Sequence, residues 1–156
     1  MRSVEEAAPE FHARFDATGK RYRYRLVTAY VVPPFDRWFV WHAPEVRDVE
    51  AMRRAAACLV GSHDFASFQG TGADTPDTTR TVRRLEIHAG DGELAFDVEG
   101  DGFLRHMVRA IVGTLADVGA GRRAPESIPG VLDAKDRRAA GLTAPASGLT
   151  LMEVFY

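Results

Sequence analysis

The stretch TVRRLEIHAGDGELAFDVEGDGFLRHMVRAIVGTLADVG, residues 81–119, decides the fold of this chain. Two runs within it, 81–89 and 93–99, are rich in residues that favour strands, and the glycine-containing connection at 90–92 is typical of a β-hairpin. Neighbouring side chains of a strand point to opposite faces, so the second run has one apolar face, made of Leu94, Phe96 and Val98. The stretch therefore begins with two antiparallel strands that bury one face.

The spacing of the apolar residues changes after Gly100. They then recur every three or four positions, which predicts a long helix with a buried stripe of Leu104, Met107, Val108, Ile111, Leu115 and Val118. Asp101 is the expected N-cap of this helix, and Gly119 and Gly121 are expected to end it.

Further elements are predicted on the N-terminal side of the hairpin. Residues 20–26 alternate between arginines and the apolar or aromatic residues Tyr22, Tyr24 and Leu26, a pattern that predicts a half-buried strand. A short apolar strand is expected at 38–41, after two prolines. An amphipathic helix is expected over 49–60, with Asp48 as its cap, and a polar exposed loop over 70–79.

On the C-terminal side, Pro125 opens a shorter helix toward Lys135, and residues 148–156 predict a final strand. The order of strand, helix, two strands, helix and strand is the split βαβ plan of ferredoxin-like folds. This predicts an α+β class, βαββαβ, in which helices cover one face of an antiparallel sheet. We expect one domain over residues 1–156.

Composition limits the possible functions. The chain has 156 residues and no apolar run long enough for a membrane span, and its first residues are too polar for a secretory signal, so a cytoplasmic protein is expected. The net charge of −2 would not attract the protein to nucleic acid, so any RNA affinity must be local. All basic residues except Lys20 and Lys135 are arginine, which binds phosphate oxygens in a bidentate way.

The residues give little support to several common kinds of site. Cys58 is expected to be a small buried apolar residue, and the spacing of the five histidines does not favour a metal site. Ser67, Ser127 and Ser147 lack the context of a hydrolase nucleophile, so a hydrolase of this kind is not supported. The alternating arginines of 20–26, and Arg105 with Arg109 beside His106, fit a solvated face and a nucleic-acid contact about equally well.

Four separated strings occur in a fixed order: FHARFDATGKRYRY at 11–24, GSHDFASF at 61–68, GFLRHMVR at 102–109 with IVG at 111–113, and GLTL at 148–151 after Lys135-Asp136-Arg137. Together they resemble the C-terminal part of the TruA family of tRNA pseudouridine synthases. Enzymes of this family isomerise uridines in the tRNA anticodon arm, act as homodimers and need no cofactor. The resemblance runs from about Phe11 to the end of the chain.

The resemblance implies roles for individual residues. Tyr22 is in the position of the active-site tyrosine that packs against the target base. Arg109 is in the position of the basic residue that pairs with the catalytic carboxylate and favours its charged form. The RNA side of the cleft would then be formed by Arg14, Lys20, Arg21, Arg105 and His106.

The chain departs from the family pattern in one respect. Members carry a Gly-Arg-Thr-Asp-x-Gly-Val-His-like string in their N-terminal half, and its aspartate carries out the covalent chemistry, but no such string occurs here. Binding residues cannot replace that carboxylate, so the chain alone is expected to be inactive. Two alternatives are open: a non-catalytic RNA-binding module, and a structural fragment that neither binds nor reacts.

Overall fold

The computed structural model describes residues 6–72 and 75–156. The first residues, used above to argue against a secretory signal, lie largely outside this range, as do residues 73–74 of the predicted loop. The elements are β1 (Gly19–Val27), β2 (Trp41–His42), α1 (Val49–Ala57), β3 (Gly61–Asp64), β4 (Thr79–Gly90), β5 (Glu93–Gly100), α2 (Met107–Gly119), α3 (Ile128–Ala134) and β6 (Leu149–Phe155).

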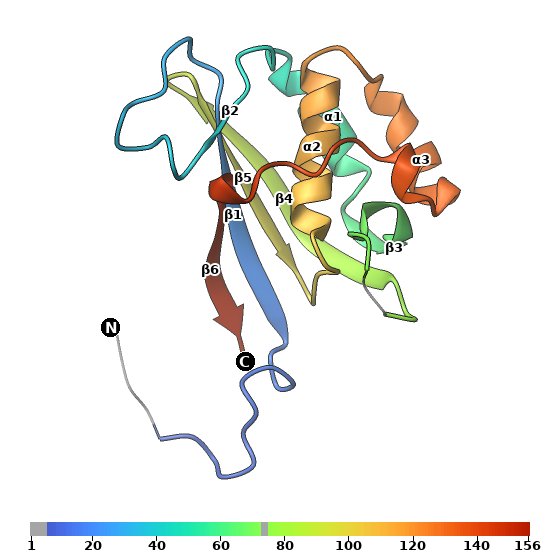
Figure 1. Ribbon diagram of the computed structural model, residues 1–156. Coiled ribbons are helices and arrows are strands. Elements are labelled where there is room, and N and C mark those ends of the chain that lie inside the picture. Colours follow the sequence, from blue (N-terminus) through green and yellow to red (C-terminus); the bar gives the residue numbers. More distant parts are fainter. Residues whose placement is uncertain (1–5, 73–74) are drawn as a thin grey trace.

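The strands form one six-stranded sheet in the order β2-β1-β5-β4-β3, and β6 also pairs with β1. β2 pairs with the end of β1 at Leu26 and Val27, whereas β6 pairs with its first part, from Gly19 to Tyr24. The run β6-β1-β5-β4 is antiparallel throughout, and the helices cover one face of it (Figure 1). The predicted ferredoxin-like α+β fold is therefore confirmed, with β2 and β3 as additional short strands.

The core lies between the sheet and the helices. The predicted inward face of β5 is buried there, with Phe96 and Val98 fully inaccessible, and Tyr24 and Leu26 of β1 lie beside it. α2 is buried on almost all sides because the segment 140–145, between α3 and β6, crosses its outer surface (Figure 1). No helix in the described part of the chain combines the length and apolarity that a membrane span requires.

The start of the long helix was predicted wrongly. α2 begins at Met107, and its N-cap is His106, which has a positive φ of 59°. Asp101 lies six residues before Met107. The Asp101 carboxylate instead accepts a hydrogen bond from the backbone N–H of Thr81 at 3.0 Å, beside the β4–β5 pairing. The spacing of apolar residues placed the helix start too early because Leu104 is buried like the residues of the helix, although it lies in the turn at 101–106.

Three other expectations need correction. The strand at 38–41 is reduced to β2, since Trp38 and Phe39 lie exposed in the loop before it. Helix α1 ends at Ala57, and Cys58 is half-buried rather than buried. β3 was not predicted, because its four residues, Gly61–Asp64, show no alternation of apolar and polar side chains.

Asp64, the last residue of β3, connects three parts of the chain and should make stability depend on pH. Its carboxylate pairs with Lys135 at 2.8 Å and accepts hydrogen bonds from the Thr78 hydroxyl and the Ala66 N–H. The bond from Lys135, followed by the one from Thr78, lowers the pKa of Asp64 to about 2. Because the folded-state pKa lies below the unfolded value, this stabilisation is complete above about pH 5 and is lost as the pH falls toward 2.

We therefore expect the free energy of unfolding of the wild type to fall more steeply between pH 5 and pH 2 than that of Asp64→Asn. Urea unfolding at pH 5 and at pH 2.5 measures this difference. Asp133→Asn, a neighbouring exposed carboxylate, serves as the control. Equal slopes for the wild type and Asp64→Asn would contradict the role given to Asp64.

Candidate functional site

A pocket of about 360 Å³ opens between β1, the N-terminal end of α2 and the start of β6. It contains four of the residues that the sequence singled out, and its lining consists of Tyr22, Phe103, Leu104, Arg105, His106, Met107, Val108, Arg109, Ala146 and Leu149. Residues far apart in the sequence are therefore brought together, and the fold places Tyr22 and Arg109 on the same cavity.

Tyr22 and Phe103 form an aromatic wall of the pocket. Their ring centroids lie 5.5 Å apart with the planes at 85°, an edge-to-face arrangement. Tyr22 is half-buried, whereas Tyr24 on the same strand face is fully buried and donates a hydrogen bond from its hydroxyl to Pro145 O at 2.8 Å. Burial raises the pKa of Tyr24. Tyr24 is thus a core residue, and Tyr22 is the tyrosine available to a planar ligand.

Arg109 gives the pocket a cationic group. Its Nε donates to the backbone oxygen of Ala144 at 2.6 Å, which leaves both terminal nitrogens of the guanidinium available. It forms no ion pair with any carboxylate in the described residues, and no acidic residue is found in the pocket lining. Burial, followed by the charges of Arg109 and Arg105, lowers the pKa of His106, which favours the neutral imidazole. The pocket is therefore suited to receive a carboxylate or another anion.

Arg105 and His106 line the pocket but lie before α2, outside the helix that was expected to begin after Asp101. A nearby loop packs against them. The Gly70 N–H donates to Arg105 O at 2.7 Å, and a terminal nitrogen of Arg105 donates to Gly72 O at 3.0 Å. A Cβ at Gly70 would lie 2.8 Å from the His106 ring, so the close approach of this loop requires glycine.

The other three residues predicted to contact RNA do not line the pocket. Lys20 lies on β1 on the same face as Tyr22. Arg14 lies in the exposed segment before β1, with its guanidinium 5.8 Å from the Phe15 ring centroid. Arg21 points to the opposite face of the sheet, where it pairs with Glu153 at 2.8 Å.

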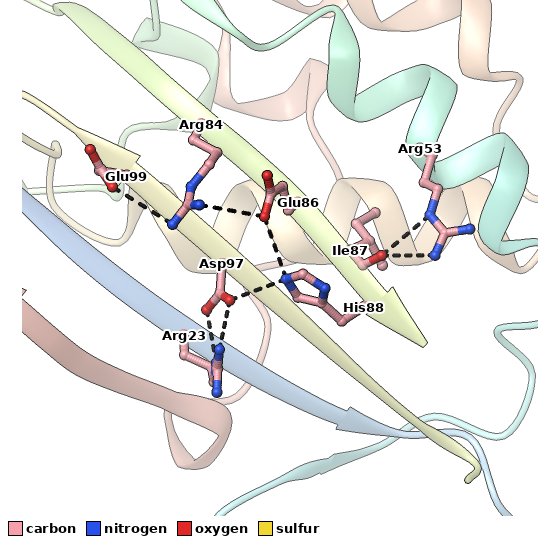
Figure 2. A network of polar contacts seen from close by, with 8 residues as sticks. All are labelled: Arg23, Arg53, Arg84, Glu86, Ile87, His88, Asp97 and Glu99. Carbon is pink, nitrogen blue, oxygen red and sulfur yellow. Dashed lines mark hydrogen bonds and ion pairs between the residues drawn. The ribbon is translucent and has the colours of Figure 1, made fainter. Parts of the chain in front are cut away.

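The arginines of β1 that face away from the helices are paired with carboxylates from neighbouring segments. Arg23 contacts both oxygens of Asp97, at 2.8 and 2.7 Å, and Arg25 pairs with Glu93 at 2.6 Å. The network continues across β5 and β4 through His88, Glu86, Arg84 and Glu99 (Figure 2). Carboxylates that already satisfy these guanidiniums would repel phosphate, so this face is poorly suited to RNA.

Two basic residues close to the turn at Gly100–Gly102 were not singled out from the sequence. Arg83 lies at a β-bulge, where the register of β4 against β5 shifts between Val82 and Arg84, and its guanidinium donates to Thr18 O at 2.8 Å. Arg80 lies beside Gly102, in the turn that leads to the pocket. A bulge redirects a side chain, and strict alternation cannot reveal it.

Comparison with known proteins identifies the family of this chain. A family model described as tRNA pseudouridine synthase matches residues 55–156. The chain is 47% identical over 99% of its length to tRNA pseudouridine synthase A of Syntrophotalea carbinolica. It is 44% identical over its whole length to the proteins of the same name from Geobacillus sp. (strain WCH70) and Geotalea uraniireducens. It spans 62%, 63% and 64% of the lengths of these three relatives. The chain belongs to the tRNA pseudouridine synthase family.

Proposed function

We propose that residues 1–156 form the C-terminal domain of an enzyme that isomerises uridine to pseudouridine in the anticodon arm of tRNA. One observation carries this proposal: a pocket with an accessible tyrosine contains an arginine without an acidic partner in the described residues. The catalytic aspartate then comes from an N-terminal domain outside this chain. The enzyme would act in the cytoplasm as a homodimer, without a metal or cofactor.

The pocket residues have complementary tasks in this reaction. The target uridine must leave its stack, which costs a few kcal/mol, and the Tyr22 ring would offset part of that cost by contact with the base. The incoming aspartate would pair with Arg109, which orients the carboxylate and keeps it ionised. The reaction breaks the N-glycosidic bond and forms a bond from the same sugar carbon to a ring carbon of the uracil. That ring carbon loses a proton and the freed ring nitrogen gains one, so the product is an isomer of the substrate. The aromatic wall of Tyr22 and Phe103 would help to retain the detached base between these steps.

The tRNA backbone would be held by the strand-end cations, a name used here for Lys20, Arg80, Arg83 and Arg105. They surround the turn at Gly100–Gly102: Lys20 is opposite Gly100 in the sheet, and Arg80 lies against Gly102. None of the four forms an ion pair within the described parts of the chain, in contrast to Arg21, Arg23 and Arg25. The carboxylate of Asp101, the acidic residue of the turn, accepts a hydrogen bond from the Thr81 N–H. Arg14 and His106 extend this surface.

Replacing Arg83 by Ala is expected to weaken tRNA binding and to reduce its dependence on salt. Each lost phosphate contact should lower the slope of log K against log salt concentration by about 0.7 to 0.9. Filter binding of unmodified tRNA to this chain at several salt concentrations measures the slope. Arg84→Ala is the matched control, because Arg84 is adjacent in sequence but its guanidinium lies near the carboxylates of Glu86 and Glu99. A loss of slope in the control but not in Arg83→Ala would place the RNA at the network of paired charges and not at the strand-end cations.

Catalysis can be tested by supplying the missing carboxylate. This chain would be combined with the portion of the Syntrophotalea carbinolica relative that it does not match, and pseudouridine would be measured in tRNA. Activity of the mixture, but of neither part alone, is expected. Activity of the present chain alone would show that the carboxylate does not come from elsewhere.

A second candidate function is RNA binding without catalysis, which is favoured by the absence of an acidic residue from the pocket lining. Salt-dependent tRNA binding by this chain, together with an inactive mixture, would support that function. A fragment that neither binds nor reacts would show no salt-dependent affinity, and gel filtration would reveal its self-association.

A further inference from the structure

The segment 140–145, which we call the strap, determines the position of Arg109. Two bonds join the strap directly to this residue: the Ala144 N–H donates to Arg109 O at 3.1 Å, and Arg109 Nε donates to Ala144 O at 2.6 Å. The strap contains no helix or strand. Its conformation therefore depends on the side chains that bind its backbone.

Arg137 holds the first part of the strap. One terminal nitrogen of its guanidinium donates to Gly141 O at 2.8 Å, and the other donates to the Thr143 hydroxyl at 2.8 Å. Arg137 forms no ion pair in the described residues, so these strap oxygens are its strongest contacts. A planar guanidinium can bind both acceptors at once, which an ammonium group cannot do with the same geometry.

Tyr24 holds the other end of the strap. Its side chain is fully buried, and its hydroxyl donates to Pro145 O at 2.8 Å. The first part of the strap also lies against α2, where the buried Thr114 hydroxyl accepts from the Gly141 N–H at 2.9 Å. Thr143 and Pro145, the residues on either side of Ala144, are thus fixed by Arg137 and Tyr24 respectively.

We infer that Arg137 and Tyr24 are positioning residues: by fixing the strap on both sides of Ala144, they hold the guanidinium of Arg109 in the pocket. Neither side chain is part of the pocket lining, so both act through Ala144. Fixing Nε on a backbone oxygen leaves the two terminal nitrogens oriented toward an incoming carboxylate. The catalytic part of this inference rests on the proposed function, but the structural part does not.

The structural part can be measured in this chain without catalysis. The hydrogen on Arg109 Nε should exchange slowly with water because it is bonded to Ala144 O. In Arg137→Lys and Tyr24→Phe, NMR should show this exchange to be faster by about fivefold to tenfold, the factor expected for weakening one hydrogen bond. Exchange of the β5 backbone amides should not change, which separates a loosened strap from a general loss of stability.

Two control variants change the same residue types away from the strap. Arg138→Lys alters an exposed neighbour that pairs with Asp136, and Tyr156→Phe removes a hydroxyl that donates to Ala13 O. Both should leave the Arg109 exchange rate at its wild-type value. An unchanged rate in folded Arg137→Lys and Tyr24→Phe would overturn the inference.

Steady-state kinetics of the reconstituted mixture test the catalytic part. Arg137→Lys and Tyr24→Phe should lower kcat by about tenfold and change KM for tRNA by less than about threefold, because substrate binding is retained while orientation is lost. Equal kcat values for these variants and the wild type would overturn the link to catalysis. If the wild-type mixture itself is inactive, the proposed function fails, and the exchange rates alone decide whether Arg137 and Tyr24 position Arg109.

Discussion

Arg109→Ala is expected to lower kcat of the reconstituted enzyme by about 10²–10³-fold, the range found when a preorganised electrostatic group is removed from an active site. Arg109 is a cation of the pocket, and its Nε is bonded to the backbone oxygen of Ala144. Without it, an incoming carboxylate would lose its orientation and part of the stabilisation of its charged form. Pseudouridine formation at saturating tRNA measures the effect.

Two further variants separate this role from simple loss of charge or of folding. Arg109→Lys keeps the charge but cannot bind Ala144 O and a carboxylate in the same fork, so it should recover only a small part of the activity. The Arg105 side chain contacts the loop at Gly72. Arg105→Ala should therefore raise KM for tRNA and affect kcat much less. Wild-type kcat in Arg109→Ala would disprove the pairing role assigned to this residue.

Patterns of side-chain type were sufficient to predict the main elements of the fold. Residues 20–26 and 93–99 alternate, and apolar residues follow helical spacing after Gly100. Each pattern reflects a buried face, so β1, β5 and α2 could be predicted from it. The errors occur where backbone geometry rather than burial decides. Asp101 satisfies a strand N–H instead of a helix end, and no local pattern distinguishes these two partners.

The candidate site could be predicted only in part, because a pocket depends on long-range contacts. The ordered strings identified Tyr22 and Arg109, and the fold brings both to one cavity. The arginines of β1 look alike in sequence, yet Arg21 is neutralised by Glu153, a residue more than a hundred positions away. The role of the strap was also hidden, since its bonds to Arg109 involve backbone atoms, which every residue type has.

The strap also makes a strong prediction about stability at Gly113. This glycine lies in the middle of α2, under the strap, where a Cβ would lie 1.8 Å from Leu142 O and 2.9 Å from the Leu142 carbonyl carbon. Replacing a helical glycine by alanine normally stabilises a helix by about 1 kcal/mol. Here the strap backbone would have to move away, and overpacking of this kind costs about 3 kcal/mol or more. Gly113→Ala is therefore expected to be destabilised by at least about 2 kcal/mol.

Urea unfolding measures this change, and Gly130→Ala in α3 is the matched control. No atom lies within 4 Å of a Cβ added at Gly130, so only the helix preference acts there, and a gain of up to about 1 kcal/mol is expected. Opposite signs for the same substitution in two helices would show that the strap lies against Gly113. If Gly113→Ala were as stable as Gly130→Ala, the strap could not lie where it fixes Ala144, and Arg109 would lose its anchor.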